Sequence, residues 1–265
     1  MLLFLALFSC NRKEEGKIYS PRTLKGKEDF NQFQQGAENA LTIYTHTAEG
    51  NTGAGGGQEL FGVKFRDTTV RIQLNASDKD AVADQFALAE FLNTQKTALL
   101  VQLADSSGLT APFYLIAVKN GKLDVVSIYR PSQGREDHRF TKGLSRIGRS
   151  GYLINNDFFI TTVDAKVYPL TRQNPGERIQ GLHFLNSADK KTLVFLVSSS
   201  LYEVNYPTGE VYTQPLSADM PKVPAQVFPW IQNNYSWQTN ARGVAFLKKN
   251  KDNDRIIDIR EFKKS

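Results

Sequence analysis

The sequence predicts a mainly β protein, an antiparallel meander of short strands with one or two short helices near the N-terminus. Three observations predict this class. From Thr97 onward, runs of β-branched and aromatic residues alternate with turn residues. Asn120-Gly121 lies between two such runs, and both residues tolerate positive φ, which is typical of a two-residue hairpin turn. Helical spacing of apolar residues is clearest after Ser77 and is confined to the N-terminal third.

The composition is that of an ordinary globular protein. The chain has 265 residues, of which 40% are hydrophobic and 23% charged, so it can fold around a core without disulfides. We expect residues 28–265 to form a single β-rich domain. The net charge of +6 is spread among acidic neighbours, and we expect no nucleic-acid partner. Cys10 is the single cysteine, which excludes an intrachain disulfide and a cysteine-rich zinc site.

An apolar segment at the N-terminus ends in a small residue and a cysteine. Every residue between Met1 and Ser9 is apolar, and Leu7 lies three places before Cys10. This pattern resembles a bacterial lipobox, although Phe8 departs from the usual small or branched residue. The resemblance implies that residues 1–9 are a signal peptide and that cleavage precedes Cys10. Acyl chains such as palmitate on Cys10 would then anchor the protein to a membrane.

The apolar segment is too short to span a bilayer, which takes about twenty apolar residues. Secretion signals also begin with basic residues, so we expect the start codon to lie upstream of Met1. Each buried methylene of an attached acyl chain contributes ~0.8 kcal/mol to membrane binding, so several chains on one cysteine suffice as an anchor. The alternative is an apolar strand or a frayed end that happens to contain a cysteine.

The residues after Cys10 are polar and charged. Lys13-Glu14-Glu15 resembles the surface-export signal of Bacteroidota lipoproteins, which implies an outer-membrane lipoprotein exposed at the cell surface. A charged linker is the alternative. The polar character continues with Pro21, so we expect residues 10–27 to hold the acylated cysteine and the tether between anchor and fold.

Two segments have apolar residues at helical spacing. Residues 29–41 permit a short amphipathic helix. The second segment begins at Ser77, a good N-cap residue with Asp80 three residues on, and continues to Leu92. The residues that define the two apolar faces are Phe30, Phe33, Ala37 and Leu41 in the first segment and Val82, Phe86 and Ala89 in the second.

Glycine-rich residues 49–57 separate two apolar stretches. A phosphate-binding P-loop requires a Lys and a Ser or Thr after its last glycine, whereas Gln58 and Glu59 follow here. The sequence therefore predicts a mobile loop at this place.

The remaining elements are predicted to be short strands, with residues 215–229, which hold four prolines, as a connector. The segment from Leu201 to Tyr212, LYEVNYPTGEVY, resembles the inner hairpin of a β-propeller blade. This resemblance implies a propeller-like meander, although we find no clean internal repeat. The predicted strands are 69–74, 97–103, 113–118, 123–129, 152–154, 158–163, 166–170, 192–197, 201–206, 210–213, 243–247 and 256–262.

The densest aromatic cluster supplies the candidate ligand-binding residues Trp230, Tyr235 and Trp237, with Phe228 beside them. Flat aromatic rings next to amide side chains suit stacking on a glycan or on an envelope protein. The alternative is core packing between two strands.

No other motif predicts a catalytic residue, a metal or a cofactor. His46, His138 and His183 lie far apart and without metal-ligand spacing. Ser187 and Lys190 match a Ser-x-x-Lys motif, but the companion motifs of that chemistry are missing and a tight turn is predicted. The acidic residues from Asp252 to Asp258 lack the glycine and glutamate of a calcium loop.

These observations predict an envelope-anchored lipoprotein with a non-catalytic domain that binds a ligand or a protein. Two alternatives stay open. One is a hydrolase whose site is assembled from acidic residues distant in sequence, and the other is an immunity lipoprotein that neutralises a toxin. Sugar-uptake genes or toxin genes beside the gene would discriminate between glycan capture and immunity.

Overall fold

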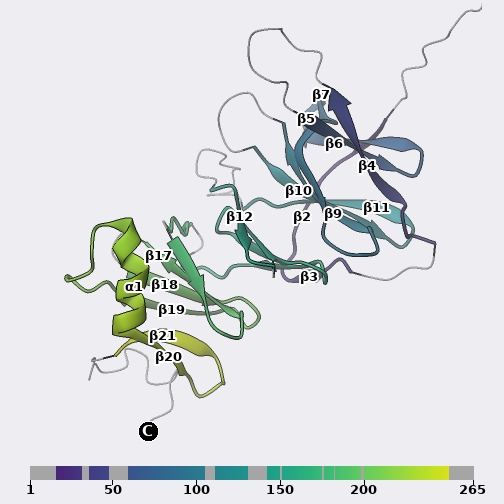
Figure 1. The fold of residues 1–265 in the computed structure, drawn as a ribbon. Helices are drawn as coiled ribbons and strands as arrows, with labels where there is room; N and C mark the ends of the chain where they lie inside the picture. Colours follow the sequence, from purple (N-terminus) through teal and green to yellow (C-terminus); the bar gives the residue numbers. More distant parts are fainter. Residues whose placement is uncertain are drawn as a thin grey trace, which may run out of the picture. The chain divides into compact units, whose positions relative to one another are not determined.

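The structure is a computed structural model that describes residues 16–31, 36–47, 59–104, 111–130, 142–149, 151–174, 176–181, 183–197 and 200–250. The protein is mainly β, as predicted, with one α-helix near the C-terminal end of the described part (Figure 1). Its contacts divide the chain into two compact units. Unit 1 comprises Met1–Leu24, Asp29–Ile128 and Val163–Ala165, and unit 2 comprises Lys25–Glu28, Tyr129–Thr162 and Lys166–Ser265. The expectation of a single domain stays a prediction.

Unit 1 is a curled, half-barrel sheet of ten strands (Figure 1). Neighbouring strands in this sheet have the order β1-β6-β5-β8-β9-β10-β11-β2. In addition, β4 pairs with β5 and β7 pairs with β6. The sheet is mixed, because the terminal pairs β1–β6 and β2–β11 are parallel and the other pairs are antiparallel. The strands are β1 Lys17–Tyr19, β2 Arg22–Thr23, β4 Leu41–Thr47, β5 Glu59–Phe65, β6 Thr68–Asn75, β7 Asp78–Ala83, β8 Phe86–Phe91, β9 Ala98–Leu103, β10 Phe113–Lys119 and β11 Lys122–Ser127.

The predicted hairpin at Asn120-Gly121 is confirmed. Strands β10 and β11 pair from Tyr114–Ser127 down to Lys119–Lys122. Asn120 has φ 52° and Gly121 φ 70°, the pair of left-handed conformations that lets the turn follow the twist of the strands. The core of unit 1 gathers around these strands and β9, with Leu99, Val101 and Ile116 fully buried.

The N-terminal segment expected to be a tether pairs with the sheet as far as it is described. Lys17, Ile18 and Tyr19 lie beside Val70, Arg71 and Ile72. Farther on, Arg22 donates two hydrogen bonds to the Asp124 carboxylate, at 2.8 and 2.7 Å. The segment is polar, so its sequence does not predict strands, but backbone pairing requires no apolar side chains at the edge of a sheet.

The predicted helix from Ser77 to Leu92 is wrong, because this segment forms strands β7 and β8. Ser77 lies in a turn in which its N–H and Oγ donate to Asn75 Oδ1. Strand β7 pairs back onto β6, and β8 pairs with β9. The apparent helical spacing arises because Asp84-Gln85 interrupts the alternation between two strands, and long-range pairing overrides the local preference.

The predicted short helix over residues 29–41 is also not present in the described residues. Strand β3 (Glu28–Asp29) occupies its start, and β4 begins at its end. Gly36 has φ 81° and Asn39 has φ 58°, and these left-handed conformations are incompatible with a continuous right-handed helix. Phe33 lies outside the described residues. Phe30 and Ala37 are buried, so the apolar spacing reflects core packing without a helix.

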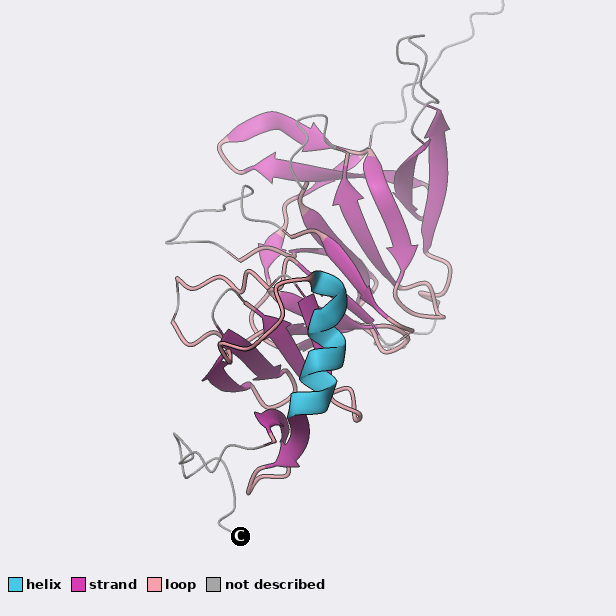
Figure 2. Ribbon diagram, turned by 60° about the vertical axis from the view of Figure 1, so that its left-hand side comes forward, coloured by secondary structure: helices cyan, strands magenta, loops and turns pink. Residues whose placement is uncertain are grey.

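Unit 2 contains two consecutive antiparallel sheets, a helix and a closing hairpin (Figure 2). The first sheet has the order β12-β13-β14-β15-β3 and the second β16-β17-β18-β19. The predicted strands that fall here within the described residues are confirmed. The elements are β12 Leu144–Ile147, β13 Gly151–Ile154, β14 Phe158–Thr161, β15 Lys166–Pro169, β16 His183–Asn186, β17 Thr192–Leu196, β18 Ser200–Asn205, β19 Glu210–Pro215, α1 Pro224–Asn234, β20 Tyr235–Thr239 and β21 Ala245–Lys249.

The second sheet of unit 2 is a middle layer with a core on each face. Because side chains alternate along a strand, Tyr202 and Val204 join the core shared with the first sheet, and Leu201 joins the core beneath α1. Figure 1 shows α1 lying beside β17 and β18. This layering fixes the side chains of β18 on both faces.

The connector predicted over residues 215–229 is only partly present, because α1 begins at Pro224. Proline is tolerated at the first helical position, where its missing N–H needs no partner. Val227 and Ile231 lie one helical turn apart and are buried against the second sheet. Pro229 lies inside the helix, which is why the sequence pattern predicted a connector. The helix forms nevertheless, because packing of its apolar face against the core stabilises it.

Candidate functional site

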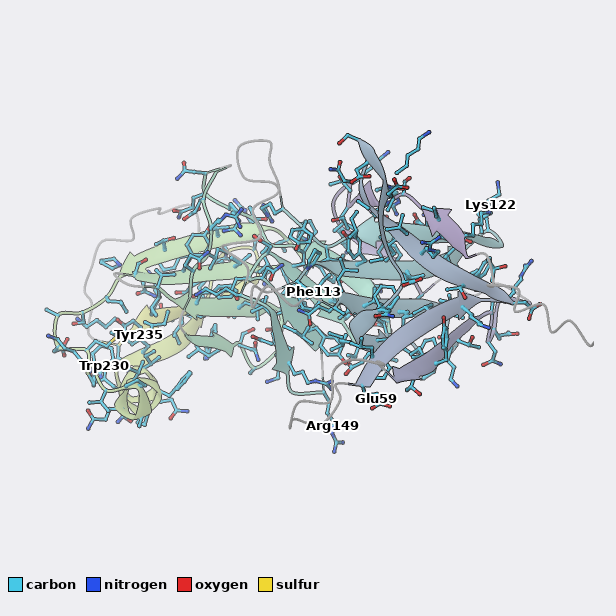
Figure 3. All side chains as sticks on the ribbon, turned by 90° about the horizontal axis from the view of Figure 1, so that it is seen from above. Glu59, Phe113, Lys122, Arg149, Trp230 and Tyr235 are labelled. Atoms are coloured by element: carbon cyan, nitrogen blue, oxygen red, sulfur yellow. The ribbon has the colours of Figure 1, made fainter. Side chains whose placement is uncertain are left out.

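The sequence-predicted site residues lie in different surroundings. Cys10 lies outside the described residues. Trp230 on α1 and Tyr235 at the start of β20 are together, with ring centroids 5.7 Å apart (Figure 3). Tyr235 is only 4% exposed and belongs to the core beneath α1, whereas Trp237 on β20 is 36% exposed. Tyr235 therefore offers little surface to a ligand, and a binding role for Trp237 stays a prediction.

The other residues weighed in the sequence are structural or lie outside the described part. Ser187 forms the predicted tight turn, because its Oγ accepts hydrogen bonds from the N–H groups of Lys191 at 3.2 Å and Thr192 at 2.9 Å. His138 and the acidic residues 252–258 are not described, nor are the side chains of His46 and His183. No group of His, Cys, Asp and Glu side chains suited to a metal occurs among the described residues.

A cleft of about 450 Å³ lies in unit 2, where the loop after β15 covers the edge of the second sheet. The loop contributes amide, carboxylate and guanidinium side chains, and β18 and β19 contribute hydroxyl groups, whereas Val197 after β17 is apolar. This mixture is polar and offers both donors and acceptors. The lining residues are Gln173, Glu177, Arg178, Ile179, Gln180, Val197, Ser200, Tyr202 and Thr213.

The polar groups of the cleft are held in place by one another. Tyr202 Oη donates to Glu177 Oε2 at 3.2 Å and accepts from the Gln173 N–H at 3.0 Å. Glu177 Oε2 also accepts from the N–H groups of Gln173 at 3.0 Å and Asn174 at 3.4 Å. Gln173 Nε2 donates to Thr213 Oγ1 at 2.7 Å. The network ties the loop to β18 and β19, so the lining is preorganised.

The phenol of Tyr202 stays protonated in this network. Burial raises its pKa to about 12, and the Glu177 carboxylate also favours the neutral form. Tyr202 is 3% exposed. At neutral pH it is therefore a fixed hydrogen-bond donor rather than an acid or a base.

Two arginines of unit 2 share one buried carboxylate. Arg172, adjacent to Gln173 of the cleft, contacts Asp157 Oδ1 through Nη2, and Arg130 Nε lies 3.3 Å from the same oxygen. The side chain of Arg172 is 2% exposed and that of Asp157 5%. Arg130 Nη2 also donates to the Leu170 carbonyl at 2.5 Å. The turn that presents Asp157 lies between the predicted strands 152–154 and 158–163, and Asn155 and Asn156 in this turn both have φ 55°.

The charge of Arg172 is incompletely compensated by the described residues. Its Nε and Nη1 are buried and have no hydrogen-bond partner there. Burial and, to a smaller extent, the positive charge of Arg130 lower the pKa of Arg172 to about 10. Tyr202, Glu177 and Arg178, which line the cleft, are close enough to interact electrostatically with this guanidinium. Arg172 therefore places an excess positive charge next to the cleft.

Sequence reasoning missed this group of residues. Arg130, Asp157 and Arg172 lie in separate loops, and no spacing rule connects residues so far apart. The one available signal was the pair of turn-forming asparagines before Asp157, which predicts a turn but not what its carboxylate contacts.

Comparison with known proteins leaves the cleft to be interpreted from its own chemistry. No described helix is long and apolar enough to cross a membrane. No family model, curated protein or solved structure matches the chain.

Proposed function

We propose that the protein is an envelope-anchored lipoprotein whose β-rich body binds a polar ligand in the cleft of unit 2 without converting it chemically. The preorganised lining of the cleft carries the proposal. Tyr202, Glu177, Gln173 and Thr213 hold one another through hydrogen bonds, so a ligand meets donors and acceptors that need little reordering. Such preorganisation favours binding because less conformational entropy is lost.

Binding is favoured over hydrolysis by the chemistry of the same lining. Hydrolysis of a glycosidic bond uses two carboxyl groups facing one substrate. Among the described residues that line the cleft, Glu177 has the one carboxylate, and its Oε2 accepts three hydrogen bonds. These contacts tie Oε2 of the carboxylate to the loop backbone and to Tyr202 on β18.

We also propose that the β-rich body is propeller-like, and the order of the strands in unit 2 supports this. Strands β12 to β15, and again β16 to β19, pair in sequence order as four-stranded antiparallel meanders. This is the strand order of one propeller blade. We propose that each meander is blade-like, while a ring of blades is not present among the described residues.

Binding in the cleft is tested with Gln173→Ala, which removes the amide that donates to Thr213. We expect protein purified from its native cells to retain a small molecule that is released on denaturation and identified by mass spectrometry. The variant should retain about fivefold less, because a lost hydrogen bond is worth ~1 kcal/mol. Gln238→Ala, which removes an exposed amide of β20, is the control. Equal retention by Gln173→Ala and the wild type would contradict binding in this cleft.

The anchor is tested with Cys10→Ser and cell fractionation. The lipobox-like segment supports acylation of Cys10, and several acyl chains hold a folded body at a membrane without a spanning helix. We expect the wild type to pellet with membranes and to incorporate a labelled fatty acid, and the variant to do neither. A variant that still pellets and a wild type without label would together remove the anchor from the proposal.

A further inference from the structure

We propose that the cleft of unit 2 binds the acidic end of its ligand, an oxyanion such as a carboxylate or a phosphate, at the wall that carries Arg178 and near the buried guanidinium of Arg172. This inference rests on the proposed function, because it names the chemistry of the ligand for the same cleft.

The first argument is the imbalance of charge behind the cleft. Asp157 is the ion-pair partner of both Arg130 and Arg172, and its Oδ1 is the atom that both approach. Among the described residues, this one carboxylate pairs with both arginines and compensates one of the two positive charges. The side chain of Arg172 is 2% exposed, so water does little to compensate the other. A buried charge of this kind is costly unless a further anion is nearby.

The second argument is the position of the buried positive charge near the cleft. Arg172 is flanked in sequence by Thr171 and Gln173, and Gln173 lines the cleft. Tyr202 and Thr213 lie on the facing strands, where the Tyr202 hydroxyl lies 3.0 Å from the Gln173 N–H. Because the field of a buried charge is weakly screened in the protein interior, it is felt most strongly at the nearest opening to solvent. Tyr202, Glu177 and Arg178 line the cleft and are close enough to Arg172 to interact with it electrostatically, so its field reaches the cleft.

The carboxylate of Glu177 in the same lining cancels this field only in part, because burial and Arg130 lower the pKa of Arg172 more than Glu177 raises it. Its Oε2 accepts from two backbone N–H groups and from the Tyr202 hydroxyl. These dipoles stabilise the negative charge locally, so less of it is left to compensate the two arginines behind the cleft. The hydroxyls of Ser200 and Thr213 provide further neutral donors at the wall. Guanidinium groups with hydroxyl donors are the usual surroundings of a bound carboxylate or phosphate.

The test is a calorimetric titration of the purified full chain with inorganic phosphate and with acetate, in chloride buffers of matched ionic strength. We expect saturable binding of at least one anion that weakens as chloride is added. Arg178→Gln should weaken it about tenfold, because a charge-assisted hydrogen bond is worth ~1.5 kcal/mol. Arg242→Gln, which removes a 62% exposed arginine of the same unit that does not line the cleft, should leave it unchanged.

A second variant probes the buried charge. Arg172→Lys keeps the positive charge and should retain saturable binding, whereas Arg172→Met should lose it while a cooperative unfolding transition shows that unit 2 still folds. If Arg172→Met does not fold, the Arg178→Gln result decides. Anion binding that is equal in Arg178→Gln and the wild type overturns the inference.

An uncharged probe separates failure of this inference from failure of the proposed function. The same chain is titrated with maltotetraose. Saturable binding of the oligosaccharide that is lost in Gln173→Ala, together with no binding of phosphate or acetate, overturns the anion inference and keeps the cleft as a binding site. No saturable binding of any of the three probes overturns both.

Discussion

The two units differ in what they bury. The core of unit 1 is apolar, and the polar residues buried among its described parts, Asn93, Thr97 and Ser127, are uncharged. Unit 2 buries Asp157, Glu203 and the side chain of Arg172. Burial of charge costs free energy unless each charge is paired. In unit 1, the buried apolar side chains contribute to a stable core. Unit 2 also buries charged side chains, and stability alone does not explain the presence of all of them.

Glu203 shows how unit 2 tolerates a buried carboxylate. The side chain is fully buried, and it accepts hydrogen bonds from the Leu247 N–H at 2.7 Å and from Gln214 Nε2 at 2.8 Å. These bonds join β18, β19 and β21, so the carboxylate fastens the closing hairpin to the second sheet. Glu203 is thus fully used by the fold, in contrast to Arg172, two of whose nitrogens have no partner among the described residues.

The largest expected effect breaks the buried ion pair of unit 2. Asp157→Asn leaves Arg172 and Arg130 without a shared carboxylate and should lower the free energy of unfolding by about 3–5 kcal/mol. Both tryptophans of the chain, Trp230 and Trp237, lie in unit 2. Their fluorescence in a urea titration therefore reports the unit that contains the substitution.

The matched control is the ion pair of unit 1. Asp124→Asn breaks the contact with Arg22, whose side chain is 32% exposed. This substitution should lower the free energy of unfolding by only about 0–1 kcal/mol. The measurement is a urea titration followed by far-UV circular dichroism. A loss below about 1 kcal/mol in Asp157→Asn would mean that the buried arginines are compensated elsewhere, which would remove the contrast between the units.

A smaller effect is expected from alkaline pH. Burial raises the pKa of Tyr202 from 10.0 to about 12, so the folded state retains a proton that the unfolded chain loses earlier. The stabilisation is complete below pH 10 and is lost as the pH rises through about 12. Two pKa units correspond to at most about 2.7 kcal/mol.

Tyr202→Phe tests this assignment. Urea titrations followed by tryptophan fluorescence at about pH 9 and about pH 11.5 should show a smaller difference in the variant than in the wild type. Tyr206, whose pKa burial also raises to about 12, should supply the remaining part. Burial also raises the pKa of Tyr19 in unit 1. Because both tryptophans lie in unit 2, the alkaline loss of stability in unit 1 is followed by far-UV circular dichroism instead. Equal alkaline loss in Tyr202→Phe and the wild type would exclude Tyr202 as its source.

The parts of the fold that the sequence predicted are those set by local chemistry. Asn120-Gly121 and Pro207-Thr208-Gly209 both turn the chain between paired strands, and Gly209 adopts φ 77°. Turn residues act through their own backbone conformations, so a short stretch of sequence contains the necessary information. The mainly β class follows from these turns and the alternating residues between them.

The parts that failed depend on partners far along the chain. Residues 78–91 resemble a helix by spacing, and only their pairing with β6 and β9 makes them strands. The parallel pairing of β1 with β6 joins segments about fifty residues apart, which no local pattern encodes. The sequence does not reveal the candidate site for the same reason, because Arg130, Asp157 and Arg172 meet only once three separate loops of unit 2 are folded.

The early start of β1 limits how far the body can stand from an anchor. Strand β1 begins at Lys17, seven residue steps after Cys10. Even a fully extended chain covers only about 25 Å over that length. If Cys10 is acylated as proposed, the first strand of unit 1 begins within about 25 Å of the acylated cysteine and therefore close to the lipid headgroups. Partners embedded in the same bilayer would then encounter the protein by diffusion in two dimensions.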